Sequence, residues 1–204
     1  MIYERRRLFT AIEKGLNAKY QQVEYIESTG TQFIDTKFIP NQDTRVVCDF
    51  QLTELKASFV FGAREASGVN NPRAYSFNMG SGGKFVTLYN GITTEVFEWD
   101  LSRHIVDKNK NVTTLDNSSR TVGYEIFTSP KTLNLFACNQ KNTYGYLPSK
   151  MKLYSCQIYD NGTLIRDFIP CYRKTDGEIG MFDMANRVFY TNQGTGKFTK
   201  GGDI

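Results

Sequence analysis

KLYSCQIYDNGTLIRDFIPC, residues 152–171, is the stretch of this sequence that decides its fold class. Asp160-Asn161-Gly162 is a turn sequence, because Asn and Gly adopt the positive φ angles that tight hairpins need. The residues on both sides are rich in β-branched and aromatic side chains, so two long antiparallel strands are predicted. Strict alternation along the first strand places Tyr154, Cys156 and Ile158 together on its buried face.

The same pattern extends outward from this hairpin over most of the chain. From Tyr20 onward, short β-branched and aromatic runs alternate with turn formers at intervals of about 8–12 residues, which is typical of a sandwich or barrel. We expect one all-β domain over residues 21–204. Its strands are predicted at 22–27, 33–35, 45–51, 58–63, 74–78, 85–89, 94–99, 105–108, 111–115, 132–138, 151–159, 163–170, 179–183 and 188–190.

Composition sets limits on function. The chain has 204 residues, 40% of them hydrophobic and 14% aromatic, which is enough for a folded core. The net charge of +4 is too small to favour nucleic-acid binding. No apolar run approaches the roughly 18 residues of a membrane span, and the basic N-terminus lacks the apolar run of a secretory signal. We therefore expect synthesis and folding in the cytosol.

Histidine and cysteine usage narrows the chemistry further. His104 is the only histidine, so sites with several histidine ligands are excluded and most histidine-based catalytic arrangements are improbable. The four cysteines, Cys48, Cys138, Cys156 and Cys171, are too widely spaced for a CxxC site. We interpret them as buried thiols that fill the core.

Residues 1–20 differ from the rest and are predicted to form a basic amphipathic arm. An apolar stripe at helical spacing indicates a short helix. The basic cluster would lie in its first turn, where the helix dipole disfavours cations, so the helix is marginal alone and needs something to dock against. Either it packs on its own domain or frays, or it anchors the protein to a partner with an acidic or apolar groove. The anchoring candidates are Arg5, Arg6, Arg7, Leu8, Phe9, Ile12 and Leu16.

Two segments resemble a known superfamily. YIESTGTQFIDT (Tyr25–Thr36) at one end, and the hairpin followed by GEIGMFD (Gly177–Asp183) and FYTNQGTG (Phe189–Gly196) at the other, are similar to concanavalin A-like, laminin-G-like domains of bacteriophage and prophage structural proteins. The resemblance spans about Tyr20 to Gly201, and the middle of the chain carries little of it.

The resemblance implies an antiparallel two-sheet jelly roll with a concave outer face and adjacent terminal strands. In those phage proteins a basic N-terminal piece ties the domain to the particle, so phage capsid or tail proteins are the partners that it implies. The superfamily includes lectins, glucanases and adhesion modules, so the activity must be argued from the site. A homotrimer would let three arms bury their apolar stripes on one another, although no long heptad run favours it.

The hydrolase alternative is weak. Glu95 and Glu98 differ by three positions and are expected on opposite faces of a strand, which leaves Glu98 and Asp100 as the only pair on one face. That spacing does not match the glucanases of this fold. No residue pattern in the sequence requires a metal ion. Calcium is the one candidate ion, with oxygen ligands from Asp35, Asp49, Asp116 and Asp183.

Glycan binding needs exposed aromatic rings beside amides and hydroxyls. Three segments offer this combination: the predicted polar loop 139–146, the segment 69–75, and Tyr89-Asn90-Gly91. Trp99 is expected to pack against a sheet instead. The candidate glycan-binding residues are Asn142, Tyr144, Tyr146, Asn71, Arg73 and Tyr75.

Together these features predict a non-enzymatic virion protein that displays a lectin-like domain as a capsid decoration, head fibre or tail component. It would be made in the host cytoplasm, and host-surface polysaccharide is its candidate ligand. The alternatives are a bacterial carbohydrate-binding or adhesion module and, more distantly, a glycan hydrolase.

Overall fold

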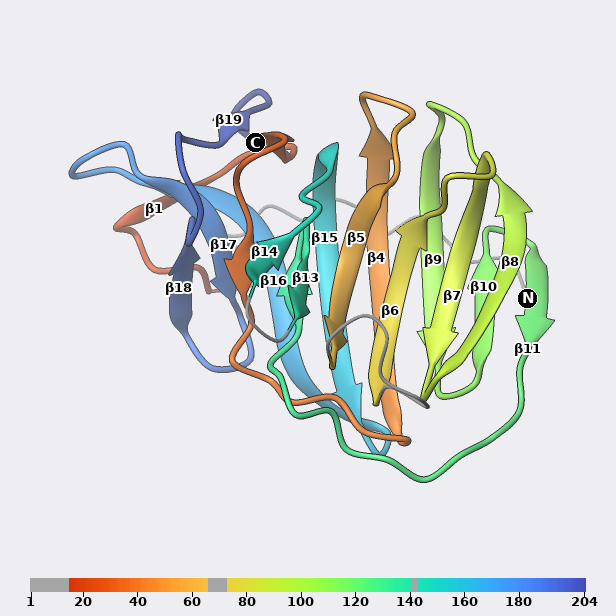
Figure 1. The fold of residues 1–204 in the computed structure, drawn as a ribbon. Coiled ribbons are helices and arrows are strands. Elements are labelled where there is room, and N and C mark those ends of the chain that lie inside the picture. Colours follow the sequence, from red (N-terminus) through yellow and green to blue (C-terminus); the bar gives the residue numbers. More distant parts are fainter. Residues whose placement is uncertain (1–14, 66–72, 141–142) are drawn as a thin grey trace.

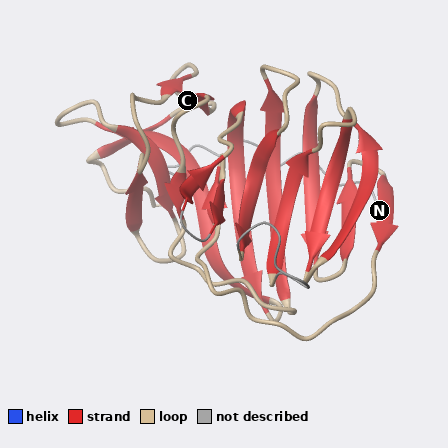
Figure 2. Cartoon of the chain, viewed as in Figure 1, coloured by secondary structure: helices blue, strands red, loops and turns tan. Residues whose placement is uncertain are grey.

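The computed structural model describes residues 15–65, 73–140 and 143–204. Within these ranges the protein is built from strands and contains no helix (Figures 1 and 2). The strands form two sheets that face one another, and their pairing is antiparallel except between β13 and β5. The predicted all-β, two-sheet architecture is thereby confirmed. Among the described residues no helix is long and apolar enough to span a membrane.

The larger sheet holds the predicted hairpin near its centre. Its main path runs, in spatial order, through β11 (Ser118–Thr121), β10 (Val112–Leu115), β9 (Arg103–Asn109), β4 (Thr44–Leu52), β15 (Lys150–Asp160), β16 (Thr163–Arg173), β17 (Ile179–Asp183) and β18 (Val188–Thr191). Three short strands complete it, namely β1 (Tyr20–Gln22), β2 (Ile26–Thr29) and β19 (Thr199–Lys200).

The smaller sheet lies in front of the larger one in Figure 1. Its path runs through β14 (Thr143–Tyr146), β13 (Cys138–Gln140), β5 (Ser58–Arg64), β6 (Ala74–Met79), β7 (Lys84–Tyr89) and β8 (Ile92–Glu98), with β3 (Ile34–Asp35) and β12 (Asn134–Leu135) attached at one side.

Aromatic side chains from both sheets fill the space between them. Phe50 of β4 makes edge contacts with Phe77 and Phe85 of the smaller sheet, and Phe77 also packs against Phe61. All four rings are fully buried, and each stabilises the fold by about 1.5–3 kcal/mol through removal of apolar area from water. This layer holds the two sheets together.

The hairpin and the adjacency of the terminal strands are both confirmed. β15 pairs with β16 from Asp160 opposite Thr163 onward, across the predicted turn. β19 pairs with β2, and Val23 bridges to Asp203. The beginning and the end of the sandwich therefore lie side by side.

Some strand predictions were wrong in detail. The structure adds β11, β14 and β19. The predicted strand 22–27 is divided between β1 and β2, and the predicted strand 132–138 between β12 and β13. Tyr154 was expected on the buried face with Cys156, but a bulge between Leu153 and Ser155 turns it to the other face. There its hydroxyl donates to Gln51, and the guanidinium of Arg103 lies 3.5 Å from its ring centroid.

The predicted helical arm lies almost entirely outside the described residues. Of its anchoring candidates, Arg5, Arg6, Arg7, Leu8, Phe9 and Ile12 fall in residues 1–14, whereas Leu16 is described. Leu16 packs against a small cluster of the sandwich that includes Ile169 and Phe182. Tyr20 begins β1 and its ring contacts Phe182 and Phe189. Leu16 and Tyr20 thus both pack against the sandwich.

Candidate functional site

A cleft beside Tyr144 is the strongest candidate site in the described part of the chain. It is a shallow, open depression of about 420 Å³. Its walls come from the loop between β2 and β3, from β14, and from the loop between β18 and β19. The lining residues are Gly30, Thr31, Phe33, Tyr144, Gly145, Pro148, Gln193, Gly194 and Thr195. We refer to it as the Tyr144 cleft.

Glycines let the three segments approach one another. Gly145 has φ +82°, and a Cβ there would collide with the ring of Phe33. A Cβ on Gly194 would collide with the backbone oxygen of Thr31. The cleft therefore depends on the absence of side chains at these two positions.

Two buried or half-buried amide side chains hold the walls in place. Asn192 Oδ1 accepts hydrogen bonds from the backbone N–H groups of Phe33 (3.2 Å) and Gly194 (2.8 Å). Gln32 Oε1 accepts from Thr29 N (2.9 Å), while its Nε2 donates to the carbonyl of Lys197 (3.1 Å). Both residues tie the first loop to the last. Such preorganisation lowers the entropy that ligand binding would otherwise cost.

Tyr144 is both exposed and fixed in position. Its side chain is 48% exposed, its ring meets Phe33 edge-on at 5.0 Å, and its hydroxyl donates to Asp35 Oδ2 at 2.6 Å. The same carboxylate oxygen accepts from Lys37 Nζ at 2.7 Å. Burial raises the pKa of Tyr144, and the bond to Asp35 raises it further, so the hydroxyl stays protonated at neutral pH.

The Asp35 carboxylate remains charged in this arrangement. Its burial raises the pKa, but hydrogen bonds from Lys37 and Tyr144 outweigh that effect, and the pKa lies below its usual value. An ionised Asp35 is a permanent acceptor that holds the tyrosine ring at the cleft wall. The ring face, the Gln193 amide and the Thr31 and Thr195 hydroxyls then form a rigid surface with one apolar platform and several polar groups.

The structure divides the predicted glycan-binding residues. Tyr144 lines the cleft. Tyr146, two residues further along β14, packs against Phe59 and the guanidinium of Arg64 instead. Both tyrosines were expected in a loop, but residues 143–146 form a strand paired with β13. Asn142 and Asn71 lie outside the described residues.

In the described part of the other predicted segments, residues 73–75 and 89–91, both tyrosine rings are buried. Tyr75 is fully buried between the sheets, where its hydroxyl donates to the carbonyls of Thr44 and Lys108, so its prediction as a glycan contact was wrong. Arg73 forms an ion pair with Glu65 at 2.6 Å. Tyr89 is likewise buried and donates to Gln42 and Glu125. Trp99 packs against the core, as expected.

Sequence reasoning missed Thr31, Phe33 and Gln193. The available signal was that both terminal segments carrying the family resemblance contain short polar runs with glycines, Thr29–Gln32 and Asn192–Gly196. No feature within either run indicated that the two runs lie next to each other and next to Tyr144 in the fold.

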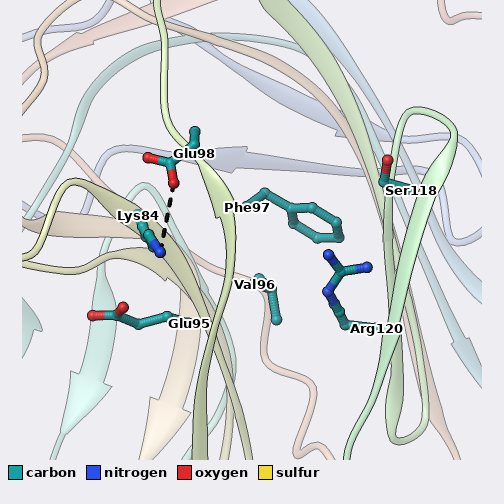
Figure 3. Close-up of a pocket in the computed structure, with 7 residues that line it drawn as sticks. All are labelled: Lys84, Glu95, Val96, Phe97, Glu98, Ser118 and Arg120. Carbon is teal, nitrogen blue, oxygen red and sulfur yellow. Dashed lines mark ion pairs between the residues drawn. The ribbon is translucent and has the colours of Figure 1, made fainter.

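A second, less open groove lies where edge strands β8 and β11 face each other across the sandwich (Figure 3). It encloses about 410 Å³ and is lined by Lys84, Glu95, Val96, Phe97, Glu98, Ser118 and Arg120. Glu95 and Glu98 both reach toward Lys84 in Figure 3, which corrects the expectation that they point to opposite faces. The cause is a bulge: Val86 pairs with Glu95 and Phe85 with Phe97, so Val96 is the extra residue.

This groove does not resemble a hydrolase centre. The Glu98 side chain is 79% exposed and its Oε1 lies 3.5 Å from Lys84 Nζ, an ion pair in open solvent. Asp100 lies beyond the end of β8 and bonds to His104. A glycosidase needs two carboxylates that face each other across the scissile bond, whereas Glu98 pairs with Lys84 and Asp100 with His104.

The aspartates proposed for calcium have separate partners. Asp49 pairs with Arg103 through two bonds, Asp116 accepts from His104 and the backbone of Ile105, and Asp183 accepts from Asn186. Asp35 accepts a hydrogen bond from the hydroxyl of Tyr144. Among the described residues, no three His, Cys, Asp or Glu side chains are grouped to hold a metal ion.

Neither the protein-family models nor the curated proteins compared with this sequence give a match.

Proposed function

We propose that this protein is a non-enzymatic glycan-binding display module that recognises surface polysaccharide through the Tyr144 cleft. The observation that carries the proposal is an exposed tyrosine ring, fixed by Asp35, in a preorganised cleft lined by hydroxyls and an amide. Pyranose rings present C–H faces that stack on aromatic rings, and hydroxyl groups that need neutral donors and acceptors. Acid–base or nucleophilic groups are not needed for that task.

The biological setting proposed is a phage virion. Its support is the resemblance of both terminal segments to concanavalin A-like phage structural domains, together with the two-sheet architecture, for which a jelly-roll arrangement is proposed. The protein would serve as a capsid decoration, head fibre or tail component. A bacterial carbohydrate-binding module would use the same cleft and is the second candidate.

A glycan array with the full chain tests the binding function. We expect the wild type to bind a restricted set of polysaccharides. Tyr144→Ala should lose about tenfold in affinity, because the stacking platform is gone. Tyr144→Phe keeps the ring face and should retain most of the binding.

Tyr146→Ala is the matched control, because that ring belongs to the same strand but lies outside the cleft. Its array profile should equal that of the wild type. The proposal is rejected if the wild type binds no glycan, or if Tyr144→Ala and Tyr146→Ala have the same effect.

A further inference from the structure

Cys48 and Cys156 lie directly opposite each other on the adjacent strands β4 and β15. Both side chains are fully buried in the main core, and their sulfur atoms are 3.1 Å apart. All four cysteines fall within the described residues, and this is the one pair whose sulfurs are within hydrogen-bonding distance.

The strand register makes this position suitable for a disulfide. The backbone N–H of Asn161 donates to the carbonyl of Asp43, just beyond the pair Asp160–Thr44. Hydrogen-bonded and non-hydrogen-bonded residue pairs alternate along an antiparallel ladder. Because Asn161–Asp43 is a hydrogen-bonded pair, Cys156–Cys48 is a non-hydrogen-bonded pair, the type whose Cα atoms are only about 4.5 Å apart. Disulfides span Cα separations of about 4.4–6.8 Å, so a bond fits with small side-chain rotations.

We propose that Cys48 and Cys156 form a cross-strand disulfide when the protein meets an oxidising small-molecule disulfide such as oxidised glutathione. One thiolate attacks the glutathione disulfide and releases one glutathione; the second then attacks the mixed disulfide and releases another. Two protein thiols are oxidised by two electrons, and the two protons end on the two glutathione thiols. The bond would link the two central strands of the larger sheet.

Burial determines when this reaction occurs. Burial raises the pKa of Cys48 well above its usual value, and the contact with Cys156 raises it further, so little thiolate is present in the folded core. Exchange is therefore expected while β4 and β15 are still open to solvent, during folding or transient opening, and is slow in the intact fold. A protein that folds in a reducing cytosol would carry the thiols, and one that folds in oxidising conditions would carry the bond.

The test is refolding of the reduced full chain with reduced and oxidised glutathione, followed by alkylation of the remaining thiols and intact-mass measurement. We expect two alkyl groups per chain instead of four, and a tryptic peptide pair joined through Cys48 and Cys156. The closed loop spans more than a hundred residues, so Tm should rise by about 5 °C or more and fall back on reduction.

The double variant Cys138→Ser, Cys171→Ser is the matched control, and it should still lose both remaining thiols to the bond. Cys156→Ala should leave three alkylated thiols. The tryptic peptide map of the wild type tests the proposal without any substitution, so its result remains valid even if a variant fails to fold. Four alkyl groups on the refolded wild type, or peptides joined through Cys138 or Cys171, would overturn the proposal.

Discussion

Lys108 is the most unusual single residue of the core. It is fully buried, its Nζ donates to Thr87 Oγ1 at 2.6 Å, and it lies 4.7 Å from the ring centroid of Tyr75. Burial lowers its pKa from the usual 10.5 to about 7. Between about pH 7 and pH 10 the unfolded chain holds this proton and the folded protein does not. Stability from this group therefore rises with pH across that window, and is lowest below it.

Lys108→Met removes the buried charge while keeping a side chain of similar length. We expect the variant to be more stable than the wild type at pH 6.5, by several degrees in Tm, and the difference to shrink as pH rises toward 9.5. Thermal unfolding followed by circular dichroism across this range measures the difference. Lys56→Met, at an exposed position, is the control and should show a difference that does not vary with pH. A pH-independent gap for Lys108→Met would contradict the assignment.

At the scale of elements, the meeting of β14 with the β2–β3 loop depends on Gly145. Gly145 and Gly162 have nearly equal φ angles, +82° and +80°, but a Cβ on Gly162 would have nothing within 4 Å, whereas one on Gly145 would strike Phe33. Gly162→Ala should therefore cost only the backbone strain, about 1–2 kcal/mol. Gly145→Ala should cost about 2 kcal/mol more, because the buried ring must move.

Urea unfolding of the two variants measures that difference, and glycan binding gives a second readout. Gly145→Ala should weaken binding along with stability, since Phe33 and Tyr144 form one wall, while Gly162→Ala should leave binding unchanged. Equal losses of stability would mean that the close approach of Gly145 to Phe33 contributes nothing.

Two β-bulges explain why the alternation rule failed in particular strands. Tyr154 is the extra residue in β15 and Val96 is the extra residue in β8, and each shifts by one position the face on which the residues beyond it lie. Tyr154 therefore leaves the core, and Glu95 joins Glu98 on one face. A bulge is defined by two residues opposing one on the partner strand, so a single strand's sequence does not reveal it.

For the molecule as a whole, two N-terminal deletions distinguish the folding of the sandwich from the proposed attachment to particles. Deletion of residues 1–22 should lower Tm more than deletion of residues 1–14, because it also removes Leu16, Tyr20 and the pairing of β1 with β16.

If residues 1–14 attach the protein to particles, the shorter deletion should also abolish co-purification with virions while glycan binding persists. Thermal unfolding and particle sedimentation measure the two effects separately. Full retention of the shortened chain on particles would remove the arm from the attachment model.

The sequence by itself determined that this protein is a β protein, where its main hairpin turns, and that Tyr144 is a candidate contact. These follow from local chemistry: Asn161-Gly162 favours a tight turn, and runs of alternating apolar residues favour strands. The same local signals could not separate Tyr144 from Tyr75, because both are tyrosines in polar surroundings along the chain.

Only the tertiary structure decided which tyrosine is buried, which faces β15 and β8 present, and which segments build the cleft. Thr31 and Thr195 are joined by a hydrogen bond of 2.9 Å across 164 positions of sequence. Burial and proximity of this kind depend on how strands pair and how the two sheets stack, and those are properties of partners distant in the chain.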